Sequence, residues 1–350
     1  MKSAVLTGVM VWLVASSTIA APPPLFSSDN AFKATLTAPL SQAYAQKGQE
    51  KRLYLDGSWS YLEDGETVRL PVKIRTRGNY RRKVCKLPPL QLNFRKKELQ
   101  DTLFDGQNKL KMVSPCRSGD KYQQLVYLEY LLYQLYALFT PHYFETRMVE
   151  VGYSDQGVDG AHWSSVNFLL EDVDDMAARS NMEEVEIVTP KRQQLDLGET
   201  ALLELFQYLI GNADYSSLRA APGEDCCHNV KLIAPEGADS GFIPVAYDFD
   251  STGLINAPYA TPPESLPIEE VTQRYFTGWC KEEARFIEAR ARLNAEREAA
   301  LALFSEFELL EKKYRKRAVS YLEKSYKTLN NERMFKRYIL ERCRGDVIKG

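Results

Sequence analysis

The sequence predicts an α+β protein with an antiparallel, β-rich N-terminal part and a mainly helical C-terminal part. Short segments of alternating polar and apolar residues follow one another between residues 32 and 94. Asp56-Gly57 and Asp64-Gly65 supply turns between them, which is typical of an antiparallel meander. From Glu282 to Cys343 the residues Ala, Glu, Arg, Leu and Lys predominate, and Pro and Gly are absent, as expected for packed helices.

The individual elements fit this division. Residues 123–139 carry Leu125, Leu128, Leu132 and Leu135 on one face, which predicts an amphipathic helix. We therefore expect a β-rich lobe over residues 21–170 and a helical lobe over residues 171–350. The predicted strands of the first lobe are residues 32–36, 53–55, 58–62, 67–76, 109–113, 144–153 and 163–171.

The most informative stretch runs from Glu199 to Asn256. An apolar stripe predicts a helix that ends at Gly211, followed by the polar loop Asn212-Ala213-Asp214. Residues 230–233 and 242–247 are short apolar runs around a polar connection, which predicts an antiparallel hairpin. At the open end of this hairpin, Asn229 would lie across from Tyr247 or Asp248.

These residues suit a chemistry that combines a metal with a base. Asn229, Asp248 and Asp250 offer the hard oxygen ligands that Mg²⁺ prefers when it holds phosphates. Asp214, on a separate loop, can accept a hydroxyl proton, and this chain order is that of kinase-type phosphoryl transfer. The alternative is structural, because Asn-x-Asp after a helix is often a turn and Asp-x-Asp after a strand is often a solvated loop.

The most basic run of the chain, Arg75 to Lys83, includes Arg77 and Gly78 at a predicted turn between two strands. Backbone N–H groups beside arginines suit phosphate oxygens. A solvated hairpin tip is the alternative interpretation.

The N-terminus has the features of a targeting segment. Lys2, an apolar run and the small residues up to Ala20 predict a signal peptide over residues 1–20, so the mature protein would be periplasmic or secreted. No later stretch is apolar enough to predict a stable membrane span. The formal net charge of −2 argues against a general nucleic-acid binder.

Export makes the six cysteines candidates for disulfides. We expect Cys85 to pair with Cys116, because both lie in the β-rich part. Cys226-Cys227-His228 is compatible with a zinc site or with a disulfide that pins the segment after Asp214.

At Asn212-x-Asp214, Asn229, Asp248-Phe249-Asp250 and Arg77-Gly78-Asn79, the sequence resembles the CotH family of secreted spore-coat kinases, within the atypical, lipid-kinase-like branch. The resemblance implies a bilobal atypical kinase-like fold that uses ATP with Mg²⁺ or Mn²⁺. Its acceptor would be a Ser or Thr hydroxyl of a protein substrate, or of an envelope or surface protein.

The resemblance also implies a role for each matching residue. Asp214 would be the catalytic base, and Asn229, Asp248 and Asp250 would be metal ligands. The other candidates would contact the nucleotide or orient its lysine: Arg77, Gly78, Lys86 as the first choice of lysine and Lys111 as the second, Glu129, and the backbone near Glu171. For Glu129, a surface glutamate on an amphipathic helix is the alternative.

Two other functions remain open. Asp248-x-Asp250 could hold the metal of a nucleotide-sugar in a glycosyltransferase, although such enzymes usually place parallel βαβ units before this motif. A kinase-like protein without catalysis could act as a scaffold in an envelope assembly. The sequence contains no Walker loop, dinucleotide fingerprint, His-Glu-x-x-His or Gly-x-Ser-x-Gly motif.

Overall fold

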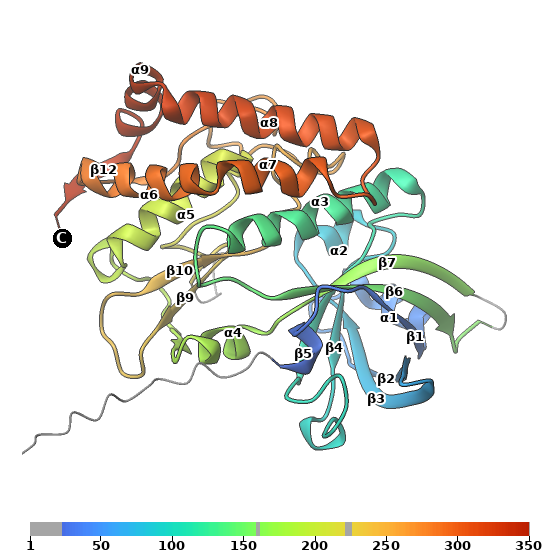
Figure 1. Cartoon of the computed structure of the whole chain (residues 1–350). Helices are drawn as coiled ribbons and strands as arrows, with labels where there is room; N and C mark the ends of the chain where they lie inside the picture. Colours follow the sequence, from blue (N-terminus) through green and yellow to red (C-terminus); the bar gives the residue numbers. More distant parts are fainter. Residues whose placement is uncertain (1–22, 159–161, 221–225, 350) are drawn as a thin grey trace, which may run out of the picture.

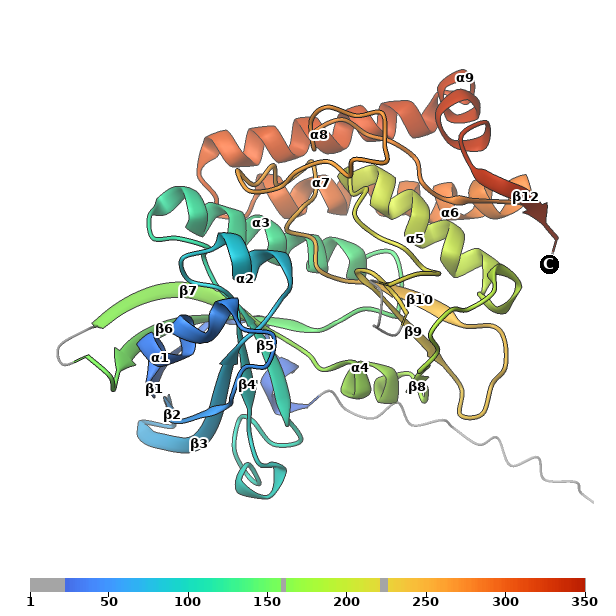
Figure 2. The ribbon, with the colours of Figure 1, turned by 180° about the vertical axis from the view of Figure 1, so that it is seen from behind.

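The computed structural model describes residues 23–158, 162–220 and 226–349, which form a β-barrel with a helical part packed on one side of it (Figure 1). The long helices α3, α5, α6, α7 and α8 lie on that side in both views, and the C-terminus lies at the far end of the helical part (Figure 1, Figure 2). The predicted signal peptide, residues 1–20, lies outside the described residues.

The barrel closes in the strand order β1-β2-β3-β4-β5-β7-β6. β1 pairs antiparallel with β2 and parallel with β6, where Phe32 lies opposite Val149 and Ala38 opposite Asp155. The strand bounds are Phe32–Ala38 (β1), Leu55–Glu63 (β2), Glu66–Thr76 (β3), Leu90–Asn93 (β4), Lys109–Val113 (β5), Thr146–Asp155 (β6) and His162–Leu170 (β7).

The closed barrel shows that the predicted bilobal kinase-like fold is wrong. In that fold the N-terminal lobe is a sheet, whereas here the parallel pairing of β1 with β6 joins the two ends of the sheet. The antiparallel pairs of β2, β3, β4 and β5 do follow chain order, as a meander predicts. Closure depends on residues more than a hundred positions apart, which local alternation does not reveal.

One predicted turn is also wrong, and its glycine has a different purpose. Asp56-Gly57 lies inside the continuous strand β2. A Cβ on Gly57 would lie 2.8 Å from both the carbonyl oxygen of Thr37 and the Cβ of Ala38. Gly57 therefore allows β2 to approach β1 closely. Asp64-Gly65 forms the predicted turn, between β2 and β3, with positive φ at both residues.

The rest of the chain is mainly helical, and α5 packs against α6, α8 and β10. The predicted helices over residues 123–139 and before Gly211 are confirmed as α3 and α5. The helix bounds are Leu40–Ala45 (α1), Tyr80–Val84 (α2), Asp120–Ala137 (α3), Val173–Arg179 (α4), Leu197–Ile210 (α5), Glu283–Ala295 (α6), Arg297–Ser305 (α7), Lys312–Asn330 (α8) and Glu332–Phe335 (α9). The remaining strands are Glu183–Glu184 (β8), Val230–Ala234 (β9), Ile243–Ala246 (β10), Trp279–Lys281 (β11) and Arg344–Ile348 (β12).

Two hydrophobic cores meet at β7. Leu169 belongs to the core inside the barrel, while Phe168 and Leu170 belong to the core of the helical part. This follows from the alternation of side chains along a strand, since β7 has one apolar face for each core. α3 precedes β6 in the chain but packs in the core of the helical part.

The cysteines form three disulfides, Cys85–Cys116, Cys226–Cys227 and Cys280–Cys343. The expected Cys85–Cys116 pair is confirmed. Both sulfurs of the candidate zinc motif are in a disulfide, so they are not thiolate ligands in this structure. Disulfides of this kind are consistent with an exported protein. None of the helices in the described ranges combines the length and apolar character needed to cross a membrane.

Candidate functional site

The β9–β10 hairpin brings the predicted metal ligands together. Ala246 pairs with Val230, and the N–H of Tyr247 donates to the carbonyl of Asn229, so Asn229 lies across from Tyr247 as predicted. Asn229 and Asp248 both adopt left-handed backbone conformations, with φ of +53° and +61°. Such conformations are uncommon for residues with a Cβ and concentrate at functional sites.

A short loop after α5 positions Asp214. Gly211 ends the helix in the left-handed conformation that glycine adopts readily. Asn212 is buried, and its side chain donates to Gln207 and accepts the N–H of Asp214, at 2.9 Å in both cases. The loop therefore has a defined shape, because the side chain of Asn212 fixes the backbone on which Asp214 sits.

Asp214 contacts both residues that immediately precede β9, His228 and Asn229. One carboxylate oxygen lies 2.7 Å from Nε2 of His228, and the side-chain amide of Asn229 donates to the carbonyl oxygen of Asp214, also at 2.7 Å. The side chains of Asp214 and His228 are both partly exposed. The amide nitrogen of Asn229 is thus turned toward Asp214, and its oxygen is left for another partner.

Helix α3 holds the other side of the hairpin end. The hydroxyl of Tyr133 accepts the N–H of Asp248 at 2.9 Å. The ring of Tyr133 packs edge-on against Phe249, with 4.7 Å between the ring centroids. Because Phe249 is fully buried, the Asp-Phe-Asp segment is anchored at its centre, and its two carboxylates flank that anchor.

Asp250 is buried beside a second carboxyl and an arginine. Arg81 lies with its Nε 3.6 Å from Asp250, and it donates to Glu129 at 2.9 Å and to the carbonyl of Ser114 at 2.8 Å. Burial raises the pKa of Asp250 to about 6, and the neighbouring Asp248 adds to this, while Arg81 acts against it. One oxygen of each carboxyl, Oδ2 of Asp250 and Oε1 of Glu129, has no hydrogen-bond partner among the described residues.

Glu129 is therefore not the surface residue that the alternative reading supposed. Its exposed fraction is 2%, and burial raises its pKa to about 8 although Arg81 lowers it. Glu129 orients Arg81 rather than a lysine.

These groups surround a cavity of about 280 Å³. It is lined by three segments far apart in the chain: residues 77–81 with Pro89, Asp214, and the hairpin with the residues that flank it. The structure thus brings together Asp214, Asn229, Asp248, Asp250, Arg77 and Gly78. The basic run differs from its prediction, because α2 forms within it and the connection from β3 to β4 is no tight turn.

Of the two lysine candidates, Lys111 lies beside this cavity and Lys86 does not. The ammonium of Lys111 sits 4.7 Å from the ring centroid of Tyr247. Burial and the nearby charge of Arg77 lower the pKa of Lys111 to about 7. No salt bridge to Lys111 occurs within the described ranges. Lys86 is exposed and lines a different cavity.

Glu171 also lies elsewhere. Its carboxylate forms two hydrogen bonds with Arg179, at 3.1 and 3.0 Å, and its N–H donates to the carbonyl of Glu145. Glu171 does not line the cavity, and these contacts are those of a structural ion pair at the end of β7.

Sequence reasoning missed three residues of the site: Arg81, Tyr133 and His228 in its contact with Asp214. Arg81 is one of several arginines in a basic run, and nothing in the pattern singles it out. Tyr133 occupies the flank of the apolar stripe of α3, where a core contact is the usual interpretation. His228 adjoins Asn229, and its position next to a proposed metal ligand was the available signal.

The donor set fits a divalent cation that also binds phosphate. Asn229 Oδ1 and the Asp248 carboxylate are hard oxygen ligands, and the Asp250 carboxylate also lines the cavity, although its Oδ2 faces Arg81 at 3.6 Å. In the described ranges no group of three His, Cys, Asp or Glu side chains is arranged to hold a metal by itself. Mg²⁺ commonly binds to one or two protein carboxylates and completes its shell with water and substrate phosphates.

Comparison with known proteins adds no assignment. No protein-family model matches the chain, and no curated protein matches it in sequence.

Proposed function

We propose that this protein is an exported phosphotransferase that transfers the γ-phosphoryl group of ATP to a Ser or Thr hydroxyl of a protein, with Mg²⁺ or Mn²⁺. One observation carries the proposal: a carboxylate on a separate loop, an Asn–Asp pair in left-handed conformations and the side chain of Arg77 line one small cavity, and Lys111 lies behind the Tyr247 ring that also lines it. The local resemblance to CotH kinases supports the same chemistry, although the overall fold differs.

The residues divide into acidic and basic sides. Asn229 and Asp248 would hold the divalent cation, which neutralises phosphate charge when bound. Arg77 and Lys111 supply positive charge near the hairpin end, where phosphate oxygens need partners. The Gly78 backbone has φ of +82° and open space around its Cα, so a phosphate can approach it closely.

Asp214 is the base in this proposal. It is partly exposed and reaches the cavity, and its Oδ2 has only a long contact of 3.4 Å with the Asn229 amide, so a substrate hydroxyl can approach that oxygen. His228 contacts the other oxygen and orients the carboxylate. Proton transfer requires this kind of positioned group within hydrogen-bond reach of the hydroxyl.

Thermal stability with nucleotide and metal tests the proposal. A ligand that binds the folded state raises the unfolding midpoint with the logarithm of its concentration over Kd. We expect ATP with Mg²⁺ or Mn²⁺ to raise the midpoint of the wild type and of Asp214→Ala, but not that of Asp248→Asn. Glu236→Gln is the matched control, because Glu236 is exposed at the opposite end of the same hairpin.

Two results would contradict the proposal. A shift with a nucleotide-sugar but not with ATP would favour the glycosyltransferase. No shift with either nucleotide would favour the non-catalytic envelope scaffold instead. If ATP binds, transfer of its terminal phosphate to a Ser/Thr peptide library should require Asp214.

A further inference from the structure

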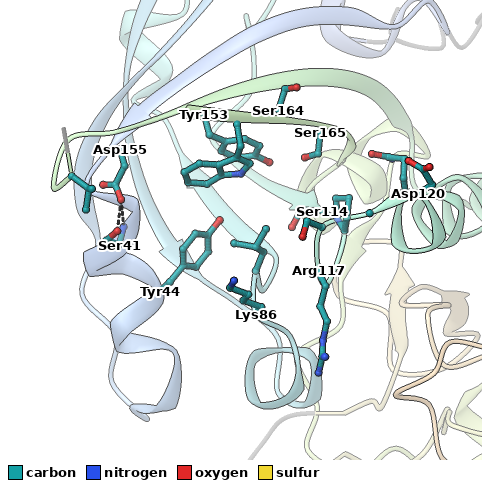
Figure 3. Close-up of a pocket in the computed structure, with 17 residues that line it drawn as sticks. Ser41, Tyr44, Lys86, Ser114, Arg117, Asp120, Tyr153, Asp155, Ser164 and Ser165 are labelled. Carbon is teal, nitrogen blue, oxygen red and sulfur yellow. Dashed lines mark hydrogen bonds between the residues drawn. The ribbon is translucent and has the colours of Figure 1, made fainter. Parts of the chain in front are cut away.

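A second cavity, of about 540 Å³, shares no lining residue with the proposed catalytic cavity. Its volume lies within the range of about 300–1,000 Å³ that is common for small-molecule pockets. Figure 3 shows it between α1, the ends of β6 and β7, and the loop that precedes α3. The Cys85–Cys116 disulfide joins two of its walls, since Lys86 and Leu87 follow one cysteine and Arg117 the other.

Aromatic rings form one wall of this cavity. Tyr153 on β6 and Trp163 on β7 are direct cross-strand neighbours, and their rings stack with centroids 5.1 Å apart and planes within 10°. The Tyr153 hydroxyl donates to Asn167 at 2.9 Å, which fixes its ring. Trp163 is thus supported from behind, and Tyr44 of α1 lies on the same side of the cavity (Figure 3).

Hydroxyl groups form much of the remaining wall. Ser114, Ser118, Ser164 and Ser165 all line the cavity. Ser114 has an exposed fraction of 5%, and its hydroxyl has no hydrogen-bond partner among the described residues. A buried hydroxyl without a partner is unfavourable, so a ligand that bonds to it gains affinity.

The charges of the lining balance one another. Lys86 and Arg117 oppose Asp120 and Asp155, and Asp155 is already engaged by Ser41 and by the N–H of Gly157. The lining therefore has no excess charge that would select an ion. It suits a neutral ligand with one apolar face and many hydroxyls.

We propose that this cavity is a binding site for a saccharide built of pyranose rings. A pyranose presents a face of C–H groups that stacks on an aromatic ring, here the Trp163 ring backed by Tyr153. Its edge presents hydroxyls that both donate and accept hydrogen bonds, as the serines of the lining do. This site is independent of the proposed phosphotransfer.

An extended peptide fits the same surface less well. A peptide would add to the edge of β7 that β5 leaves uncovered, because β5 pairs only with Phe168, Leu169 and Leu170. The side chain of Gln123 already donates to the carbonyl of Val166 and accepts its N–H, at 2.8 and 3.0 Å. That edge is therefore partly covered.

Calorimetric titration of the full chain tests the proposal. The probes are glucose, maltotriose, cellotriose and the β-1,4-linked trimer of N-acetylglucosamine, followed by an immobilised panel of natural glycans. We expect at least one saccharide to bind, and Trp163→Ala and Ser114→Ala each to raise its Kd at least tenfold. Trp279→Phe is the control, because Trp279 is a tryptophan outside this cavity.

Ser114→Ala separates binding from folding. Its hydroxyl has no hydrogen-bond partner among the described residues, so the variant should unfold at a midpoint no lower than that of the wild type while its saccharide affinity falls. The proposal is overturned if no saccharide binds, or if binding is unaffected by both substitutions. Trp163-dependent binding of a peptide library without saccharide binding would also overturn it.

Discussion

Gly211→Ala should destabilise the loop that carries Asp214 through two separate effects. Gly211 has φ of +68°, which an alanine adopts only with strain. A Cβ at this position would also lie 1.9 Å from the hydroxyl oxygen of Tyr321 and 2.9 Å from the ring carbon that bears it. An alanine at position 211 would therefore have a strained backbone and would also clash with the side chain of Tyr321.

The expected magnitude follows from the two effects. Left-handed backbone costs about 1–2 kcal/mol in a residue with a Cβ. Overpacking a tight contact costs typically about 1–3 kcal/mol more. Gly211→Ala should therefore lower the free energy of unfolding by about 2–5 kcal/mol. Gly237→Ala is the matched control, because Gly237 has φ of +73° with nothing within 4 Å of a Cβ, so only the backbone cost applies.

Urea unfolding followed by circular dichroism measures both variants, and adding Tyr321→Phe to Gly211→Ala separates the effects. The double variant should recover part of the packing cost, because the nearest atom is removed, and keep the backbone cost. Tyr321→Phe alone gives the baseline, since that hydroxyl also donates to the carbonyl of Thr272. The reasoning fails if Gly211→Ala costs no more than Gly237→Ala.

Three further predictions concern the charged groups of the site. Arg81→Met should lower the free energy of unfolding at pH 7 by about 3 kcal/mol, which is the low end for a broken buried ion pair, because Glu129 is partly protonated at that pH. Adding Glu129→Gln to this variant should recover part of the lost stability. An unchanged urea midpoint in Arg81→Met would contradict the prediction. Burial raises the pKa of Glu129 to about 8 and that of Asp250 to about 6, so the folded state holds more protons than the unfolded state and wild-type stability should fall as the pH rises from about 4 to 7. Above pH 7 the lowered pKa of Lys111 acts in the opposite direction. Glu129→Gln should flatten the fall between about pH 6 and 7, as measured by urea unfolding at each pH, and an equal slope in both proteins would refute the assignment. Lys111→Met should weaken ATP binding at least tenfold, while Lys109→Met, at an exposed position of the same strand, should leave ATP binding unchanged. Because the pKa of Lys111 is about 7, the affinity of the wild type for ATP should also decrease as the pH rises from 6 to 8.

The parts of the site that the sequence predicted are those set by short-range structure. Asn229 lies opposite Tyr247 because two apolar runs with a polar connection have one favourable antiparallel register. Asp214 lies beside that pair because Gly211 ends α5 and the next residues form a defined turn. In each case fewer than fifty residues are involved, and the spacing of apolar and turn residues determines the result.

The parts that could not be predicted depend on contacts across the chain. Barrel closure joins β1 to β6, and the identity of the phosphate lysine depends on where β5 comes to lie against Tyr247. The sequence favours Lys86 over Lys111, because Lys86 follows the Arg77-Gly78-Asn79 stretch. The fold turns that stretch toward the second cavity, after α2 and the Cys85–Cys116 disulfide.

The two aspartates of Asp248-Phe249-Asp250 are also not equivalent, which the motif alone does not show. Phe249 is buried in the core, so Asp248 before it and Asp250 after it project into different surroundings. Asp250 is buried against Arg81, and its raised pKa means that its negative charge is partly lost near neutral pH. Asp248 is half-buried, its backbone is held by Tyr133, and it follows Tyr247, which lies across from Asn229. A cation at this site would thus take its main charge from Asp248, and Asp250 with Arg81 and Glu129 would fix the segment from which Asp248 projects.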